Sequence, residues 1–458
     1  MNISKINIDQ FDRAYLIGIG GIGMSALARY FKSIDWVVGG YDKTPTPLTK
    51  NLEKEGIKIH YKDLKNFIPK HFQNIKKTLV IYTPAIPSSL GELIYIKNNG
   101  FILFKRAEVL GMITKNSKSL GIAGTHGKTT IATMVTHVLN QSKYKCTSFL
   151  GGISTNINSN FITNEYPEYT VIEADEFDRS FLQLSPFASI ISSIDPDHLD
   201  IYKNINCIKK EFQNFANLIN VNGFMIKHKD LKITHPNTIS YGLNFGADYI
   251  GENIRFENNT FIFDVKTPSC SWKNVILGVP GIHNAENALA CIALCSQLGL
   301  NENEIRNPLA SFKGVKRRFE YHIKSEKLVY IDDYAHHPKE INALISSIKL
   351  LYPRKKITAI FQPHLFSRTK DFMTDFAEEL SKVDELILLP IYPAREKPIE
   401  GITSKKLLDK ITIKNKKTLS PKETLDNICK NKLDVVLTIG AGDIDKIVIP
   451  IKEKLLKR

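Results

Sequence analysis

A glycine-rich stretch near residue 125 carries a lysine and several hydroxyl side chains. It reads Gly124, Thr125, His126, Gly127, Lys128, Thr129 and Thr130. Glycines let backbone N–H groups approach phosphate oxygens, and the following helix, expected over 131–139, adds positive potential at its start. Lys128 suits the outer phosphates and the Thr129 hydroxyl suits Mg²⁺. We predict a nucleotide-phosphate site, although the glycine spacing departs from the standard G-x-x-x-x-G-K-[ST] loop; a structural glycine turn is the alternative.

Acidic and histidine side chains follow two apolar segments further along the chain. The segment 169–172 leads into Glu173, Asp175 and Glu176, and the segment 188–194 leads into Asp197, His198 and Asp200. In a parallel α/β sheet, ligands collect where strands end. We predict that Glu173 binds Mg²⁺, with Asp175 or Glu176 as further candidates, and that His198 contacts a metal or a phosphate. A solvated acidic turn and helix caps at Asp197 and Asp200 remain the alternatives.

A second glycine turn lies near the N-terminus. The residues in question are Gly18, Gly20, Gly21, Ile22, Gly23 and Met24. They separate an expected strand over 14–17 from an expected helix over 24–31, and the next strand, 36–41, ends at Asp42. This G-x-G-x-x-G pattern with an acidic residue about 20 positions on predicts a diphosphate at the helix start and a ribose near Asp42. By itself the pattern serves NAD, FAD or a UDP-sugar.

Polar side chains also gather before a later helix and after four later strands. His283, Asn284 and Asn287 precede or open a helix over 288–294, where they either cap the helix or bind a base or a phosphate. The expected strands are 328–331, 357–361, 386–389 and 435–439. Each is followed by a loop rich in Asp, His, Arg or Gly, which predicts another open α/β sheet with a ligand-binding edge.

Length and composition limit the class of protein. A chain of 458 residues is too long for one core and suits about three α/β domains, which we place at 1–107, 108–314 and 315–458. The net charge is +15, but the lysines are spread out, so we expect no nucleic-acid partner. The sequence shows neither an 18-residue apolar run nor a signal peptide. We therefore expect no membrane partner and a cytoplasmic location.

The assembled motifs resemble the Mur ligases of peptidoglycan precursor synthesis over the whole chain. The motifs are 18–24, 124–130, 173–176, 197–198, 280–288, 333–338 and 362–364. The short G-T-x-G-K-[ST] loop is itself this family's form. The resemblance implies a Rossmann-like N-terminal domain that binds a UDP-sugar, a central P-loop ATPase-like domain with a mainly parallel sheet, and a Rossmann-like C-terminal domain that binds the amino acid.

Within the family, the resemblance implies ATP-dependent joining of L-alanine to the lactyl carboxylate of UDP-N-acetylmuramate through an acyl phosphate. ATP and Mg²⁺ would be held by Lys128, Thr129 and Glu173, and His198 matches a residue associated with a second metal. Candidates for stabilising the oxyanion or holding the alanine carboxylate are His336, His337, Arg368 and Arg395. Many relatives have a basic residue where this chain has Leu365, so a bidentate anion contact at that place is either absent or made by Arg368.

Other functions remain open from the sequence. One is the family's recycling ligase, which joins a tripeptide to UDP-N-acetylmuramate. The others are a nicotinamide-dependent oxidoreductase and an inactive nucleotide-binding regulator, but both leave the intact Lys128, Glu173 and His198 without a role. Either a monomer or a homodimer is compatible with the sequence. Acceptance of serine or glycine is also possible, because a methyl-sized pocket discriminates by only about 1–3 kcal/mol.

Overall fold

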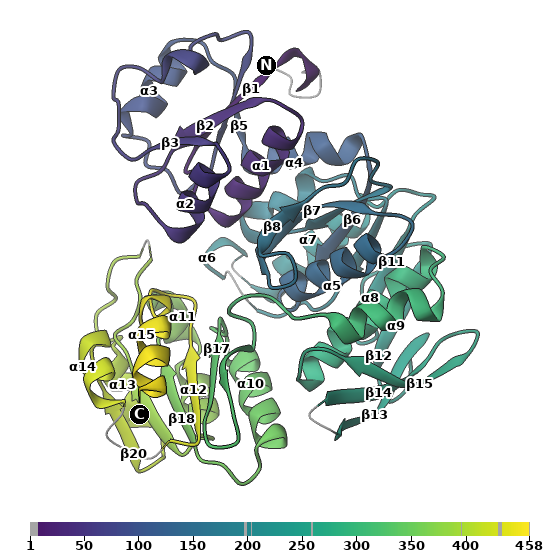
Figure 1. The fold of residues 1–458 in the computed structure, drawn as a ribbon, viewed down its shortest axis with the longest axis vertical. Coiled ribbons are helices and arrows are strands. Elements are labelled where there is room, and N and C mark those ends of the chain that lie inside the picture. The colour runs from purple at the N-terminus through teal and green to yellow at the C-terminus, as the bar shows by residue number, and fades with distance from the viewer. Residues whose placement is uncertain are drawn as a thin grey trace. The chain divides into compact units, whose positions relative to one another are not determined.

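Strands and helices alternate along most of the chain (Figure 1). The computed structural model describes residues 8–196, 199–202, 204–257, 260–394, 396–428 and 433–457. The chain forms two compact units. The first consists of Met1–Glu252, Val265–Trp272 and Asn287–Ala310, and the second of Asn253–Asp264, Lys273–Glu286 and Ser311–Arg458.

The N-terminal sheet has five strands in the order β3-β2-β1-β4-β5, and neighbouring strands are parallel. The strands are β1 (Arg13–Ile17), β2 (Val37–Tyr41), β3 (Lys58–His60), β4 (Thr78–Tyr82) and β5 (Leu103–Lys105). The chain runs from β1 to β2 on one side and then returns to place β4 on the other. Ligands of open α/β sheets bind where the strand order reverses in this way, and here that point is the carboxyl end of β1, where the predicted diphosphate turn begins.

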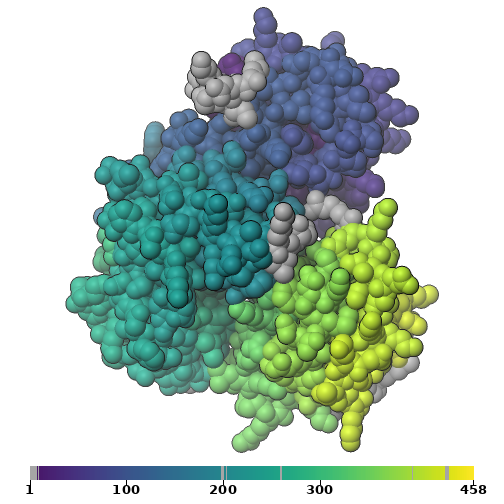
Figure 2. Space-filling view, turned by 180° about the vertical axis from the view of Figure 1, so that it is seen from behind, coloured from purple at the N-terminus to yellow at the C-terminus, as the bar shows by residue number. Residues whose placement is uncertain are grey.

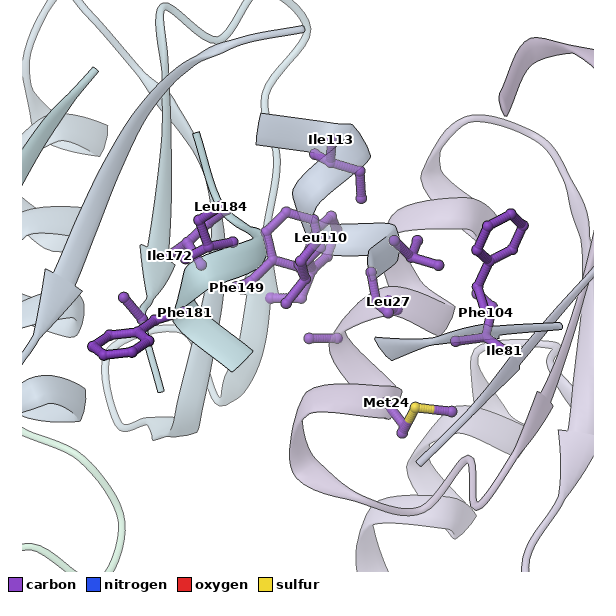
Figure 3. Close-up of a cluster of buried hydrophobic side chains, with 14 of the residues drawn as sticks. Met24, Leu27, Ile81, Phe104, Leu110, Ile113, Phe149, Ile172, Phe181 and Leu184 are labelled. Atoms are coloured by element: carbon purple, nitrogen blue, oxygen red, sulfur yellow. The ribbon is translucent and has the colours of Figure 1, made fainter. Parts of the chain in front are cut away.

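Alternate residues of β1 face two different apolar layers. Tyr15 and Ile17 belong to a cluster with α3 (Gly91–Asn98), whereas Ala14 and Leu16 pack with α1 (Ile22–Ser33) and α4 (Arg106–Lys115). The α1 and α4 layer continues without a break into the central part of the chain. Figure 3 shows this shared core, in which Leu27 and Leu110 lie in the same cluster as Phe149 and Phe181. Continuous apolar burial explains why both parts belong to one unit.

The central sheet has ten strands in the order β15-β14-β13-β12-β11-β10-β6-β9-β7-β8. Its strands are β6 (Lys118–Ala123), β7 (Cys146–Ser154), β8 (Ser159–Ile162), β9 (Tyr169–Glu173), β10 (Ala188–Ile191), β11 (Phe224–His228), β12 (Thr238–Leu243), β13 (Tyr249–Glu257), β14 (Thr260–Lys266) and β15 (Ser271–Leu277). Strand β6 is parallel to both of its neighbours, β9 and β10. The residues that follow these three strands therefore meet at one edge of the sheet.

The C-terminal sheet has six strands in the order β16-β17-β21-β18-β19-β20, and only β16 is antiparallel to its neighbour. Its strands are β16 (Glu320–Lys324), β17 (Val329–Asp333), β18 (Ile357–Phe361), β19 (Glu385–Leu388), β20 (Asn415–Thr418) and β21 (Val435–Ile439). Helix α15 (Asp445–Leu456) packs on one face through Ile447 and Ile451, and α12 (Met373–Leu380) contacts the other through Phe376. In the space-filling view the green to yellow residues of this domain form one continuous body (Figure 2).

The two units also contain the remaining helices. They are α2 (Pro47–Lys54), α5 (Lys128–Gln141), α6 (Leu199–Tyr202), α7 (Ile205–Ala216), α8 (Ile282–Gln297), α9 (Glu302–Ser311), α10 (Pro338–Leu351), α11 (Phe366–Asp371), α13 (Ser404–Lys410), α14 (Pro421–Asn427) and the 3-10 helices η2 (Ile8–Gln10), η3 (Lys70–Phe72) and η4 (Phe177–Gln183). None of the helices in the described part of the chain is long and apolar enough to cross a bilayer.

The predicted α/β class, with mainly parallel sheets, is confirmed. One strand prediction was too long: β10 ends at Ile191, because the next residues turn to bond the phosphate loop, with Thr125 N donating to Ser193 O at 3.0 Å. Strand β16 was not predicted, although its five residues alternate between polar and apolar types, with Tyr321 and Ile323 as the apolar ones.

Candidate active site

The predicted phosphate loop connects β6 to α5, and its backbone requires glycine at two positions. Gly124 has φ +135° and Gly127 has φ +84°, values that L side chains rarely adopt. A Cβ at Gly124 would overlap Ser192 Oγ, and a Cβ at Gly127 would lie 2.6 Å from Asn287 Oδ1. The loop is thus held between β10 and α8. Asn287, predicted as a site residue, lies directly against it.

Lys128 is the first residue of α5, and its side chain is mostly buried. Its Nζ donates to Gly124 O at 2.7 Å and to the two carboxylate oxygens of Glu176 at 2.7 and 2.9 Å. Burial opposes the charge, but the neighbouring carboxylates of Glu176, Asp175 and Glu173 outweigh it and raise the pKa of Lys128. Burial also raises the pKa of Glu176, and Lys128 offsets part of that effect. The lysine is therefore a fixed cation at the helix start.

Glu173 ends β9 and is held in place from two sides. Thr129 Oγ1 donates to Glu173 Oε1 at 3.0 Å, and Gly151 N donates to Glu173 Oε2 at 2.9 Å. A Cβ at residue 151 would overlap the carboxylate, so a glycine is needed there. A hydroxyl and a carboxylate that touch are oxygen donors of the kind Mg²⁺ selects. The donor set therefore fits this cation.

Of the predicted residues near this edge, His126 lies within the described part of the chain. His126 Nε2 lies 3.4 Å from Asp195 Oδ2, on the loop after β10. Asp197 and His198 lie outside the described residues, as does Arg395. Thr125 N donates to Ser193 O at 3.0 Å, and this bond ties the phosphate loop to the same segment.

The N-terminal glycine turn follows β1 and opens α1. Gly18 has φ +83°, and Gly20 N donates to Asp42 Oδ2 at 2.8 Å, so the acidic residue at the end of β2 holds the turn itself. No side chain caps α1, and its first turn contains no acidic residue. The guanidinium of Arg106, which the sequence did not single out, lies against Gly23: a Cβ there would be 2.8 Å from Nη1.

Asn284 and His283, two of the residues predicted at the start of α8, differ in their hydrogen bonding. Asn284 Nδ2 donates to Pro280 O at 2.6 Å, which ties the first turn of α8 to the segment before it and does not cap the helix. His283 Nδ1 is buried and forms no hydrogen bond to any residue that the structure describes. Burial lowers the pKa of His283 to about 4, so its imidazole is neutral near pH 7.

Three rings and one guanidinium gather at the carboxyl edge of the C-terminal sheet. The rings of His336 and His364 are 6.0 Å apart, and His364 stacks on Tyr392 at 5.7 Å. Arg368 Nη1 lies 3.3 Å from His364 Nδ1, and Arg368 is buried. His364 was visible only as part of the Q-P-H motif and was not predicted as a site residue.

His337 has a local structural role that the sequence did not predict. It is the N-cap of α10, where its Nδ1 accepts from Lys339 N at 3.3 Å, and its ring contacts Phe372. His336, by contrast, is turned toward His364 and forms a 2.9 Å hydrogen bond between Nδ1 and Tyr334 O.

Leu365 occupies a strained backbone position directly after the Q-P-H motif. Its φ of +71° is unfavourable for a side chain with a Cβ. The residue begins the turn into α11, and this turn brings Arg368 beside His364. Such strain is typical of functional sites. The structure thus places the Arg368 guanidinium beside His364, one turn after Leu365.

The chain was compared with known proteins. Profiles of the "Mur ligase family, catalytic domain", the "Mur ligase middle domain" and the "Mur ligase, glutamate ligase domain" match residues 13–118, 122–295 and 317–442. UDP-N-acetylmuramate–L-alanine ligase of Cytophaga hutchinsonii is 47% identical over 98% of this chain and 97% of its own. The chain belongs to the Mur ligase family.

Other relatives agree with this membership. The Mur ligase of the same name from Flavobacterium psychrophilum is 50% identical over 98% of this chain and 99% of its own. The crystal structure of UDP-N-acetylmuramate–alanine ligase from Thermotoga maritima is 28% identical, covers 97% of this chain and 99% of its own, and has a TM-score of 0.84. A murein peptide ligase from Psychrobacter arcticus shares the fold, with a TM-score of 0.69 at 22% identity, covering 97% of this chain and 98% of its own.

Proposed function

We propose that this Mur ligase joins L-alanine to the lactyl carboxylate of UDP-N-acetylmuramate, with ATP converted to ADP and phosphate. The product is UDP-N-acetylmuramoyl-L-alanine, a peptidoglycan precursor. The main support is the 46–50% identity, over nearly the whole chain, to relatives that carry the name of this activity. We assign the UDP-sugar to residues 1–107, ATP and Mg²⁺ to 108–314 and the amino acid to 315–458, in the cytoplasm.

The central part activates the substrate. A carboxylate reacts poorly with an amine, so it first attacks the γ-phosphate of ATP and becomes an acyl phosphate. The protein's contribution to such a step is mainly positioning and charge neutralisation. Lys128 supplies a buried positive charge at the helix start, and the loop from Gly124 to Thr130 supplies backbone N–H groups.

Mg²⁺ fits the oxygen pair formed by Thr129 and Glu173. When bound, it supplies positive charge that stabilises the transferring phosphoryl group. Thr129 and Glu173 would orient it, and Gly151 N would keep the carboxylate in position. We assign His198 to a second metal on the family resemblance.

The N-terminal turn is assigned to the UDP-sugar. The residues involved are Gly18, Gly20, Gly21, Ile22, Gly23 and Met24. The uncapped start of α1 supports this assignment, because its N–H groups are available to a diphosphate. One carboxylate oxygen of Asp42 holds the turn by accepting from Gly20 N. The second oxygen accepts from Thr44 N at 3.2 Å, and we assign this oxygen to the ribose.

The C-terminal edge is assigned to alanine and to the tetrahedral intermediate. Arg368 and His336 carry this role, because they converge with His364 on one place. His337 supports His336 from the helix cap. His283, Asn284 and Asn287 are assigned to the nucleotide, of which Asn287 has the best support because it touches the phosphate loop.

Phosphate release tests the proposal. The purified chain is given ATP, Mg²⁺ and UDP-N-acetylmuramate with L-alanine, L-serine, glycine or the L-Ala-γ-D-Glu-diaminopimelate tripeptide. We expect release with alanine and coincident formation of UDP-N-acetylmuramoyl-L-alanine by mass. Release with the tripeptide alone would refute the proposal and assign the chain to the recycling branch.

A further inference from the structure

Arg106 lies where the N-terminal and central parts of the first unit meet. It follows the edge strand β5 directly and is the first residue of α4. Its side chain is 23% exposed, which is low for an arginine. The side chain reaches back over the first turn of α1, where a Cβ on Gly23 would lie 2.8 Å from Nη1 and 2.9 Å from Cδ. Gly23 therefore makes room for this guanidinium.

The guanidinium has little to bind within the protein. It donates no hydrogen bond to any residue in the described part of the chain, and its one ionic neighbour there is Asp175, whose Oδ2 lies 3.9 Å from Nη2. The nearest acidic residue on α4, Glu108, accepts from Lys105 N instead. A guanidinium has five N–H donors, and leaving them unsatisfied beside a mostly buried surface is unfavourable. A ligand anion would satisfy them.

The surroundings indicate which anion. The start of α1 is uncapped and free of acidic side chains, so it favours negative charge. An arginine beside it adds a planar pair of donors that matches two phosphate oxygens. We infer that Arg106 binds the diphosphate of the nucleotide sugar, together with the backbone of Gly21 to Met24. This inference rests on the proposed function, which places a UDP-sugar at this turn.

Arg106 would also connect the two substrate sites. Asp175 belongs to the group of carboxylates after β9, which includes Glu173 and Glu176. Its Oδ1 accepts from Phe177 N at 3.1 Å, so the residue is positioned by its own turn. A guanidinium between Asp175 and the diphosphate fixes the sugar nucleotide relative to the carboxylates around Lys128. Arg106 is thus a binding residue for the diphosphate and a positioning residue for the reacting carboxylate.

The test measures nucleotide binding directly. UDP and UMP are titrated calorimetrically into the full-length chain and into Arg106→Met, Arg106→Lys and Lys105→Met. Lys105 is the matched control, because it is the preceding residue, carries the same charge and is exposed in a pair with Asp178 at 3.5 Å. We expect Arg106→Met to weaken UDP binding by about 10- to 100-fold, the scale of a lost charged hydrogen-bond pair.

Further outcomes follow from the role assigned. The preference for UDP over UMP should shrink in Arg106→Met. The UDP affinity of Arg106→Lys should lie between those of Arg106→Met and the original chain. The KM for ATP should change by a smaller factor than the UDP affinity. Lys105→Met should keep its UDP affinity within about twofold.

Two results would overturn the inference. One is unchanged UDP affinity in Arg106→Met. The other is an equal loss for UDP and UMP that Arg106→Lys does not relieve, which would indicate a structural role only. If the original chain bound neither UDP nor UDP-N-acetylmuramate, the proposed function itself would be refuted, so the two failures are distinguishable.

Discussion

Lys128 Nζ contacts both carboxylate oxygens of Glu176, at 2.7 and 2.9 Å, with 13% and 2% of the two side chains exposed. The lysine assigned to the phosphates is therefore paired with a carboxylate of its own chain. We predict that phosphate oxygens replace Glu176 as partners of Lys128 when ATP binds. On the proposed function, the ion pair holds the cation in place before ATP binds, and ATP binding exchanges one anion for another.

Replacing Glu176 by Gln should destabilise the nucleotide-free protein and increase its response to nucleotide. The variant leaves a buried lysine without its counter-charge, which costs on the order of 3 kcal/mol, and ATP would restore that charge. We expect a lower melting temperature and a larger ATP-induced rise, measured by thermal unfolding. The control is Glu168→Gln, which removes the exposed partner of Lys118 at 2.8 Å and should cost about 0–1 kcal/mol. If ATP raised the melting temperature equally in the original chain, Glu176→Gln and Glu168→Gln, the predicted replacement of Glu176 by phosphate would be contradicted.

Replacing Thr129 by Val should raise the Mg²⁺ concentration needed for activity. The side chain keeps its volume but loses the hydroxyl that contacts Glu173 at 3.0 Å. We expect at least about a tenfold increase in the concentration giving half-maximal phosphate release. Thr133→Val is the control: it lies one turn further along α5, where its hydroxyl bonds Thr129 O at 2.6 Å. A parallel change in both variants would indicate a helix effect and not a metal ligand.

Replacing Asn160 by Ala should weaken binding of the UDP-sugar more than binding of ATP. This fully buried residue of β8 donates to Ile22 O and Ser25 Oγ of α1, and it accepts from Arg29. It therefore fixes the first turn of α1 against the central sheet. We expect a loss of about 2–3 kcal/mol of stability and a KM increase of several-fold for UDP-N-acetylmuramate.

A second asparagine serves as the control for Asn160. Asn164 also bonds through its amide, to Asn140 Oδ1 at 2.7 Å and Cys146 O at 2.9 Å, but within the central part alone. Asn164→Ala should lower stability without a selective change in KM. A similar KM for UDP-N-acetylmuramate in both variants would contradict the coupling of α1 to β8.

Asp333 should make the stability of the C-terminal domain depend on pH. Burial raises the pKa of this carboxyl from 3.8 to about 6, despite Arg318 nearby and donors at Phe319 N and Ala335 N. A carboxyl with a raised folded-state pKa favours the folded state while it is protonated. Its contribution is therefore complete below about pH 4 and is lost as pH rises through about 6, by roughly 3 kcal/mol in all.

The Asn variant of Asp333 checks this sign. Asp333→Asn cannot ionise, so its melting temperature relative to the original chain should increase from pH 4.5 to pH 7.5. Asp409→Asn, at an exposed position on α13, should show no such trend. If the difference in melting temperature between Asp333→Asn and the original chain stayed constant with pH, the raised pKa of Asp333 would be contradicted.

The sequence by itself determined the elements that short contiguous patterns encode. Strand β1, the glycine turn and α1 follow one another within 21 residues, and β6, the phosphate loop and α5 within 24. Local sterics and hydrophobic spacing are enough to specify such units. The motif order was also sufficient for the family resemblance, and hence for the α/β class and the expected reaction.

Only the tertiary structure decided which side chains meet. Lys128 and Glu176 are 48 positions apart, and Arg106 lies 83 positions after Gly23; nothing local in the sequence marks either pair. His336 and His337 are adjacent in a single motif, yet one turns to His364 and the other caps α10. Partners that lie far apart in the chain are chosen by parallel strand order and shared burial, and these depend on the whole fold.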